Sequence, residues 1–202
     1  MKRQCFLLVL ITAIMGLCVS SCSKDDEEEV HLSVEIKADG TTSNGSTFSA
    51  IDDKNFYLDY VKYTIESGHL EVSGFDKANL KGNVTIPATI TYKGTSYNVL
   101  SVCDHAFFRC YGATSVIIGN NVTSIGEYAF LGTGLTSISI PNSVVSIGGW
   151  AFSDCIGLTS ITIPNNVTSI GSSAFSDCSG LTSITISNNV TFIGDNAFSY
   201  SI

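Results

Sequence analysis

Apolar residues recur at fixed offsets in the C-terminal half of the chain, with Ser, Thr and Asn at many of the positions between them. One period runs from Leu158 to Gly180, and the same pattern starts again at Leu181. An Ala-Phe pair marks each period and falls at 106–107, 129–130, 151–152, 174–175 and 197–198. The interval between successive Ala-Phe pairs is constant except for the second one, which is shorter by one residue. A fixed period of about 20 to 50 residues predicts a solenoid of stacked coils.

Each period predicts a short strand followed by a turn. The isoleucines of the step Ile161-x-Ile163 lie on one face of a strand, because side chains alternate across a strand, and we expect both to face inward. Pro164 ends this strand, since proline cannot donate to a ladder. A second apolar step, through Val167 and Ile170, leads to a compact turn at the Ala-Phe pair, for which one turn of helix is an option. The other isoleucines expected to face inward from this step are Ile138, Ile140, Ile184 and Ile186.

The offsets combine into one motif, Leu-x-x-Ile-x-Ile-Pro-x-x-Val-x-x-Ile-Gly-x-x-Ala-Phe-x-x-Cys, which covers residues 84–202. This motif resembles the BspA-like class of bacterial leucine-rich repeats. The chain departs from it at Ala113, where Leu is expected, and at Cys103, where Gly is expected. The coil after Phe130 is one residue short and lacks its Cys. The fold that the resemblance implies is a β-rich leucine-rich-repeat solenoid whose repeat length is about 22 to 23 residues.

Residues 22–96 lack most of the repeat signatures. We interpret residues 22–54 as an acidic tether with one strand over residues 30–37, where apolar and polar residues alternate, and a loop over residues 38–53, which are rich in Gly, Ser and Thr. Residues 55–96 predict β-hairpins that turn at residues 66–69 and at Lys93-Gly94. We expect this segment to be an N-terminal β-hairpin cap on the solenoid of residues 97–202, because an uncapped end exposes apolar surface and strand edges.

The last coil of the predicted solenoid lacks its closing strand. The sequence stops at Ser199–Ile202, ahead of the Leu-x-x-Ile-x-Ile step, so about 4.5 coils are expected. Two explanations stay open. In the first, the C-terminus is truncated relative to that of related proteins. The absence of a Lys or an inward charge that would protect the edge strand favours this explanation. In the second, the exposed edge pairs with another strand.

Residues 1–21 have the features of a lipoprotein signal peptide. Met1-Lys2-Arg3 precedes an apolar run from Cys5 to Val19, which is too short to indicate a membrane span. The tetrapeptide Val19-Ser20-Ser21-Cys22 resembles a lipobox, so Cys22 is the predicted lipidation site. An ordinary secretory signal followed by an unmodified Cys is the alternative. The acidic run Asp25–Glu29 resembles the signal that sends lipoproteins of Gram-negative gut anaerobes to the cell surface. We therefore expect an outer-membrane, surface-exposed protein, anchored to the membrane through Cys22 only.

The titratable residues do not indicate catalysis. Three histidines, His31, His69 and His105, are spread over the chain without a paired carboxylate or a nucleophile pattern nearby. The glycines follow the repeat and form no phosphate-binding motif, and no Cys-x-x-Cys or Cys/His spacing indicates zinc. The sequence therefore predicts a non-enzymatic protein without a cofactor.

Charge excludes one further class of partner. The formal net charge is −8 at pH 7, and Arg109 is the only basic residue after Lys93, so the solenoid lacks the basic surface that nucleic-acid binding needs. Asp154 and Asp177 share one repeat offset, but two carboxylates fall short of the six to eight oxygens that calcium takes. The prediction is no metal site.

The cysteines of the repeats occupy one offset. Cys110, Cys155 and Cys178 share it, so we expect them to be buried as small apolar side chains in a ladder. A disulfide between Cys155 and Cys178 is the alternative, because the Cα atoms of adjacent coils lie within bonding reach.

Two sets of outward positions are candidate ligand-binding residues. The strands present a hydroxyl-rich face that suits an extended partner, although a soluble strand surface of high β-propensity has the same composition. This face includes Thr136, Ser139, Thr159, Thr162, Thr182 and Thr185. The offset before the Ala-Phe pair carries His105, Tyr128 and Trp150 in successive coils, with Phe108 and Tyr111 near. These rings are expected to form an aromatic strip for protein or sugar partners; shielding of the core is the alternative.

The resemblance to BspA-like proteins implies attachment to host extracellular-matrix proteins or to other cells. We therefore expect a binding or adhesion module whose partner is a host or bacterial surface protein. A carbohydrate-capturing surface lipoprotein of a nutrient-uptake system is the second hypothesis, with the aromatic strip as the platform for a glycan.

Overall fold

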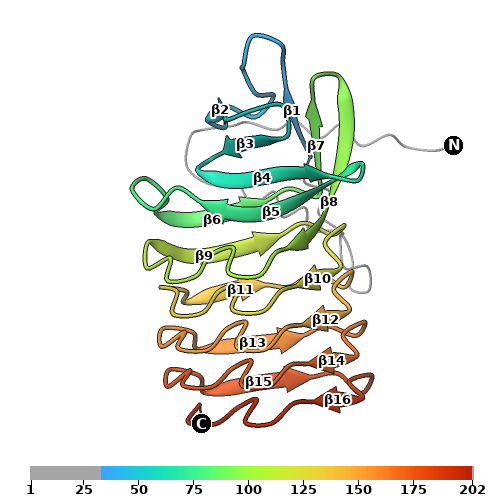
Figure 1. Cartoon of the computed structure of the whole chain (residues 1–202). Coiled ribbons are helices and arrows are strands. Elements are labelled where there is room, and N and C mark those ends of the chain that lie inside the picture. Colours follow the sequence, from blue (N-terminus) through green and yellow to red (C-terminus); the bar gives the residue numbers. More distant parts are fainter. Residues whose placement is uncertain (1–32, 202) are drawn as a thin grey trace, which may run out of the picture.

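The computed structural model describes residues 33–201 (Figure 1). The predicted signal peptide, the predicted lipidation site Cys22 and the acidic run after it lie outside these residues. Within the described range the chain forms sixteen strands and no helix. Accordingly, this range contains no helix of the length and apolarity needed to cross a membrane.

The N-terminal part of the described chain contains eight strands. They are β1 Ser33–Ile36, β2 Phe48–Ala50, β3 Asn55–Leu58, β4 Val61–Glu66, β5 His69–Phe75, β6 Gly82–Ile86, β7 Thr89–Tyr92 and β8 Thr95–Val102. The following coils contain the other eight. They are β9 Ala113–Ile118, β10 Ser124–Ile125, β11 Ser137–Ser139, β12 Ser146–Ile147, β13 Ser160–Ile163, β14 Ser169–Ile170, β15 Ser183–Ile186 and β16 Phe192–Ile193.

The coils stack through two columns of parallel strands. On one side lie β6, β9 and β11, followed by β13 and β15; on the other side β8, β10, β12, β14 and β16 pair in order (Figure 1). Equivalent residues pair between coils, as Ile147 does with Ile170 and Ile161 with Ile184. Each repeat therefore adds one strand to each column, which confirms the predicted solenoid.

A cap of antiparallel strands continues the stack at its N-terminal end. The strands β2, β3, β4 and β5 pair in sequence, and β5 joins the solenoid by pairing parallel to β8. The predicted hairpins turn at Ser67-Gly68, between β4 and β5, and at Lys93-Gly94, between β7 and β8. The hairpin cap is thus confirmed. A third hairpin, between β3 and β4, was not predicted, because the residues from Phe56 to Ile65 alternate like a single strand, whereas Asp59 and Tyr60 form a turn within it with φ of 48° and 66°.

Two strands lie in the segment interpreted as a tether. The expected strand is confirmed at β1, which pairs with β7. The loop expected over residues 38–53 is wrong in part, since β2 pairs with β3 and the half-buried Phe48 ring packs 5.8 Å from Phe56. Packing against the cap decides this strand, because Ser49 and Ala50 give it little apolar signal of its own. The division at residue 54 between tether and cap stays a prediction.

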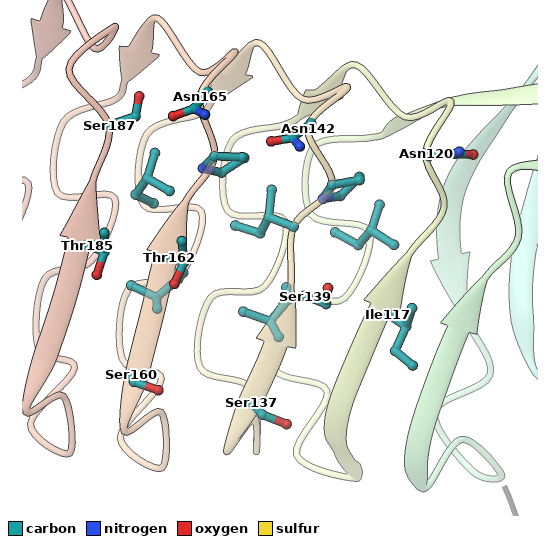
Figure 2. Close-up of a pocket in the computed structure, with 17 residues that line it drawn as sticks. Ile117, Asn120, Ser137, Ser139, Asn142, Ser160, Thr162, Asn165, Thr185 and Ser187 are labelled. Atoms are coloured by element: carbon teal, nitrogen blue, oxygen red, sulfur yellow. The ribbon is translucent and has the colours of Figure 1, made fainter. Parts of the chain in front are cut away.

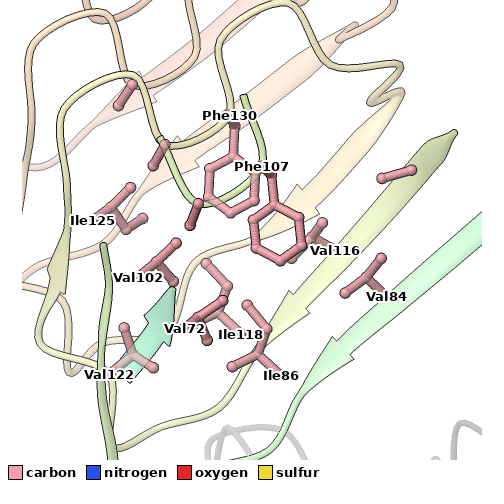
Figure 3. Packing of buried hydrophobic residues seen from close by; sticks show 14 of the residues in the cluster. Val72, Val84, Ile86, Val102, Phe107, Val116, Ile118, Val122, Ile125 and Phe130 are labelled. Atoms are coloured by element: carbon pink, nitrogen blue, oxygen red, sulfur yellow. The ribbon is translucent and has the colours of Figure 1, made fainter. Parts of the chain in front are cut away.

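The core is a stack of aromatic and aliphatic ladders. The rings of Phe107, Phe130, Phe152 and Phe175 are fully buried, with centroids 5.0 to 5.2 Å apart in successive coils and interplanar angles of 4° to 7°. Figure 3 shows Phe107 and Phe130 side by side among aliphatic side chains from both strand columns. Each fully buried side chain of this size stabilises the fold by about 1.5–3 kcal/mol relative to an exposed one. The ladder of identical rings therefore stabilises the packing of each coil against the next.

The turn through each Ala-Phe pair is not helical. Each turn contains two residues with positive φ, whereas an α-helix needs φ near −63°. The first column consists of His105, Tyr128, Trp150, Ser173 and Asn196, with φ between 52° and 61°. The second consists of Arg109, Gly132, Asp154, Asp177 and Tyr200, with φ between 54° and 63°. Alternate N–H groups of the turn donate to the next coil, as Trp150 does to the Ser172 carbonyl over 2.9 Å, while Ser153 donates within its own coil to the Trp150 carbonyl over 3.2 Å.

Candidate binding surfaces

A groove of about 800 Å³ runs across the strands β9, β11, β13 and β15 (Figure 2). Its lining contains a row from the strands, Ile117, Ser139, Thr162 and Thr185, and a row from the turns that follow them, Asn120, Asn142 and Asn165. No lining residue carries a charge. The groove therefore presents hydroxyl and amide groups, and its lining has no charged side chain that would favour an anionic or a cationic ligand.

The groove lies over a break in the strand column. Within residues 33–201, β11 pairs with β9 and β13 pairs with β15, but β11 does not pair with β13. A Cβ atom added to Gly157 would lie 3.0 Å from the Leu135 carbonyl oxygen of the coil before it. At Gly134 and Gly180 the added Cβ atom would instead lie 2.3 Å from the carbonyl oxygen of the residue before the equivalent glycine, Tyr111 and Ile156. The equivalent residue for Gly157 is Thr133, which does not provide the nearest atom, so the two coils at the break meet differently from the neighbouring coils.

The shortened coil accounts for the position of this break. The residue missing between Phe130 and Leu135 is lost directly before β11. Ile138 and Ile140 are half-buried and line the groove, whereas Ile161 and Ile163 of the next coil are 4% and 1% exposed. The expectation that both isoleucines face inward is confirmed for this coil, since both pack against the core, but their burial is incomplete. The same holds for Ile184 and Ile186, which are half-buried because β15 has a strand on one side only within the described residues.

The predicted strand hydroxyls separate into two rows. All six are exposed, as expected. Ser139, Thr162 and Thr185 line the groove, while Thr136, Thr159 and Thr182 lie outside it. In the outer row the Thr182 hydroxyl donates to the Thr159 carbonyl over 3.1 Å, and the Thr136 hydroxyl donates to the Thr114 carbonyl over 3.1 Å. The inner row is the better candidate, because its members share a concave surface.

The aromatic strip forms as a stack of three rings. The centroids of His105 and Tyr128 lie 4.8 Å apart with an interplanar angle of 22°, and those of Tyr128 and Trp150 lie 5.2 Å apart with an angle of 4°. Trp150 is 38% exposed. Phe108 is half-buried, with its centroid 5.6 Å from that of His105, and Tyr111 is 71% exposed. The strip and the groove have no predicted residue in common.

The sequence did not mark the asparagines or the half-buried isoleucines as site residues. A signal for the asparagines was present, because Pro-Asn follows the strand at residues 141–142 and again at residues 164–165. A signal for the isoleucines was the short coil after Phe130, whose departure from the motif does not by itself indicate a change in the strand column.

The repeat cysteines are buried and free. The Cys155 thiol donates to the Phe130 carbonyl over 3.2 Å, and the Cys178 thiol donates to the Phe152 carbonyl over 3.0 Å. Burial raises the pKa of Cys155 to about 11 and that of Cys178 to about 12, so both stay protonated donors at neutral pH. Thr133 fills the cysteine position in the short coil, and Ser201 fills it in the last one, where its hydroxyl donates to the Phe175 carbonyl.

Cys103, which stands where Gly is expected, contacts the cap. Its thiol donates to Glu71 Oε2 over 3.2 Å, and His69 Nε2 lies 3.4 Å from the other oxygen of the same carboxylate. Burial and the Glu71 carboxylate raise the pKa of Cys103 to about 12, which keeps this thiol protonated. Among the described residues no group of three or more His, Cys, Asp or Glu side chains is arranged to hold a metal ion.

Stacked parallel strands, buried ladders and an open strand face define a leucine-rich-repeat solenoid with a surface groove. The chain belongs to the family described as the BspA type leucine rich repeat region, whose model matches residues 75–202 in six copies. The match begins at Phe75, the last residue of β5, so the family extends further toward the N-terminus than the motif at residues 84–202 indicated.

Solved structures share this fold. A leucine-rich-repeat protein from Bacteroides ovatus is 42% identical, with a TM-score of 0.65; the match covers 71% of this chain and 38% of that one. The T. pallidum leucine-rich-repeat protein is 27% identical, with a TM-score of 0.64, and the match covers 70% of this chain and 65% of that one. A leucine-rich cell surface protein from Faecalibacterium prausnitzii has a TM-score of 0.53 at 24% identity, over 76% of this chain and 54% of that one. This chain thus spans less than two thirds of each of these three proteins. No curated protein matches the chain significantly.

Proposed function

We propose that the chain is a non-enzymatic adhesion module on a bacterial surface that holds a host or bacterial surface protein in the groove over β11 and β13. The groove carries this proposal. At its centre lie the half-buried side chains of Ile138, Ile140 and Pro141, surrounded by exposed hydroxyls and amides. An apolar centre inside a polar rim is the usual composition of a protein-binding surface.

The proposed location is the outer face of the outer membrane, with a lipid anchor at Cys22. The lipobox at residues 19–22 and the acidic run after it support this, and the F. prausnitzii protein of the same fold is described as a cell surface protein. Because β1 and β2 pair with β7 and β3, the proposed tether is limited to the residues before Ser33.

The groove is tested by a substitution that introduces a long, positively charged side chain into its lining. Thr162 is exposed and lines the groove, so Thr162→Arg should leave the core intact and weaken binding to surfaces coated with collagen or laminin by at least about tenfold. Thr168→Arg is the matched control, since Thr168 is exposed in the same coil but outside the groove. Equal binding by the two variants would show that the groove is not the binding surface.

The second candidate function is capture of a glycan by the aromatic strip. It is favoured by the stacked rings of His105, Tyr128 and Trp150 at the surface, since aromatic rings bind the apolar faces of sugars. Competition separates the two functions. Matrix-protein binding that free glycans do not inhibit supports the first, and glycan binding that Trp150→Ala abolishes supports the second.

A further inference from the structure

The aromatic column stops at Trp150. Tyr128 has a ring on each of its faces, whereas Tyr128 is the only ring that stacks on Trp150 among the described residues. In the next two coils the equivalent positions are Ser173 and Asn196. Successive coils lie about 4.8 Å apart, so the level at which a fourth ring would stack carries a small hydroxyl side chain instead. One face of the indole therefore has no aromatic partner of its own.

Folding does not require an aromatic ring at this offset. The residue has positive φ in every coil, 52° at Trp150, and this conformation favours Gly, Asn and Asp over large side chains. The backbone bond is the same without a ring: the N–H of Trp150 donates to the Ser172 carbonyl over 2.9 Å, and that of Ser173 donates to the Asp195 carbonyl over 2.9 Å. An aromatic side chain kept in an unfavourable conformation points to a use other than stability.

In the next two coils, the side chains at this offset and at the one before it are polar and include no cation. Beyond the indole lie Ser173 in the next coil and the exposed Asp195 and Asn196 in the coil after it. Glu127 is exposed beside Tyr128, while Gly149 adds no side chain beside Trp150. An apolar ring face beside hydroxyl, amide and carboxylate groups matches a pyranose, which has a face of C–H bonds and a rim of hydroxyls. The carboxylates oppose an anionic sugar.

Trp150 is 38% exposed. We propose that its indole face without an aromatic partner is a subsite for a neutral pyranose ring, which continues the stack of His105, Tyr128 and Trp150 and directs its hydroxyls to Ser173, Asp195 and Asn196. This inference rests on the second candidate function and specifies its ligand as a neutral, not an acidic, glycan. It is independent of the groove over β11 and β13, whose lining shares no residue with this subsite.

Trp150 is the only tryptophan of the chain, so indole fluorescence reports on this subsite alone. Titration of the folded protein with cellohexaose and with maltohexaose should produce a saturable change of emission with at least one of them. Oligogalacturonate, an acidic oligosaccharide, should produce none. Saturable binding of the acidic probe at an equal or lower concentration would overturn the assignment of a neutral ligand.

Trp150→Asn tests whether the ring acts on the ligand or on the fold. Asn occupies the same offset in the last coil, so the melting temperature should stay equal or rise, while calorimetric affinity for the neutral probe falls at least about tenfold. Tyr60→Asn is the matched control, since Tyr60 is 40% exposed with φ of 66° in the cap. It should leave sugar affinity unchanged.

The outcomes separate this proposal from the functions on which it builds. A neutral sugar that binds Trp150→Asn as tightly as the unchanged protein overturns the subsite but leaves glycan capture standing. Failure of both neutral probes to bind overturns the subsite and removes its support for glycan capture, without affecting protein binding in the groove. A melting temperature lowered by Trp150→Asn, with sugar affinity unchanged, identifies the ring as cover for the core.

Discussion

Adjacent residues of one strand have opposite environments in this fold. In β13, Ile161 and Ile163 are buried while Ser160 and Thr162 are exposed. Side chains alternate across a strand, and the inward face of the strand packs against the core of the solenoid. A substitution in a strand therefore acts on the core or on the exposed face according to whether its position is odd or even in the alternation. The same alternation places Thr162 in the groove without a role in the core.

At the residue scale we predict that Ile161→Asp unfolds the central coils. An unpaired carboxylate in the buried ladder has no polar partner, so the free energy of unfolding should fall by more than about 3 kcal/mol. Thr159→Asp, at an exposed position of the same coil, should change it by no more than about 0.5 kcal/mol. Thermal melting followed by circular dichroism measures both, and equal melting temperatures would contradict the inward and outward assignment.

At the scale of the element, β11 is the irregular strand of its column. It has three residues, while β9 has six and β13 has four, and it pairs with β9 alone. Thr133 keeps the buried position that cysteine has in the neighbouring coils, so the missing residue affects the chain after Thr133 and not the core before it. A single deletion in one turn thus opens the strand column and leaves the Phe ladder intact.

Restoring the missing residue should close the break. Inserting one Ser between Thr133 and Gly134 recreates the spacing of the neighbouring coils, so we expect β11 to pair with β13, the melting temperature to rise and the amides of β13 to exchange more slowly. Partner binding should weaken as Ile138 and Ile140 withdraw from the groove. The same insertion between Asn44 and Gly45, in an exposed turn of the cap, is the control. Unchanged amide exchange in β13 would mean that the short coil does not cause the break.

At the scale of the whole molecule, equivalent residues of successive coils line up and form continuous surfaces along the solenoid. Because every coil advances by one strand spacing, a residue type repeated at one offset becomes a ladder that runs along the solenoid. The groove and the aromatic strip are two such surfaces with separate residues, so one solenoid can offer two binding sites. The proposed binding functions require that the groove and the aromatic strip be accessible to partners outside the cell.

The proposed anchoring rests on the N-terminal sequence. We predict that Cys22→Ser releases the protein from the membrane fraction, because this residue is the proposed attachment point of the acyl chains. Replacement of the acidic residues 25–29 by Lys should leave the protein anchored but facing the periplasm. Protease treatment of intact cells measures the exposure, and protection of the unchanged protein would contradict the surface location.

Features that depend on the period alone could be predicted from the sequence. The fold class, the buried Ala-Phe ladder, the exposed hydroxyl rows and the stacking of His105, Tyr128 and Trp150 all follow once equivalent offsets are placed in register. Translation by one strand spacing brings such residues together whatever the details of the turn. The hairpins at Ser67-Gly68 and Lys93-Gly94 were predictable for a local reason, since Gly allows the positive φ that a tight turn needs.

Features that depend on contacts between coils were decided only by the tertiary structure. The turns with two residues of positive φ are held by bonds to the next coil, so their local sequence, with Trp, Tyr and Ser at the same position, does not mark them. The short strand β2 exists because the cap packs against it. The break between β11 and β13 depends on how two coils meet, which no single repeat contains. The missing pairing leaves Ile138 and Ile140, inward by their pattern, half-buried in the lining of the groove.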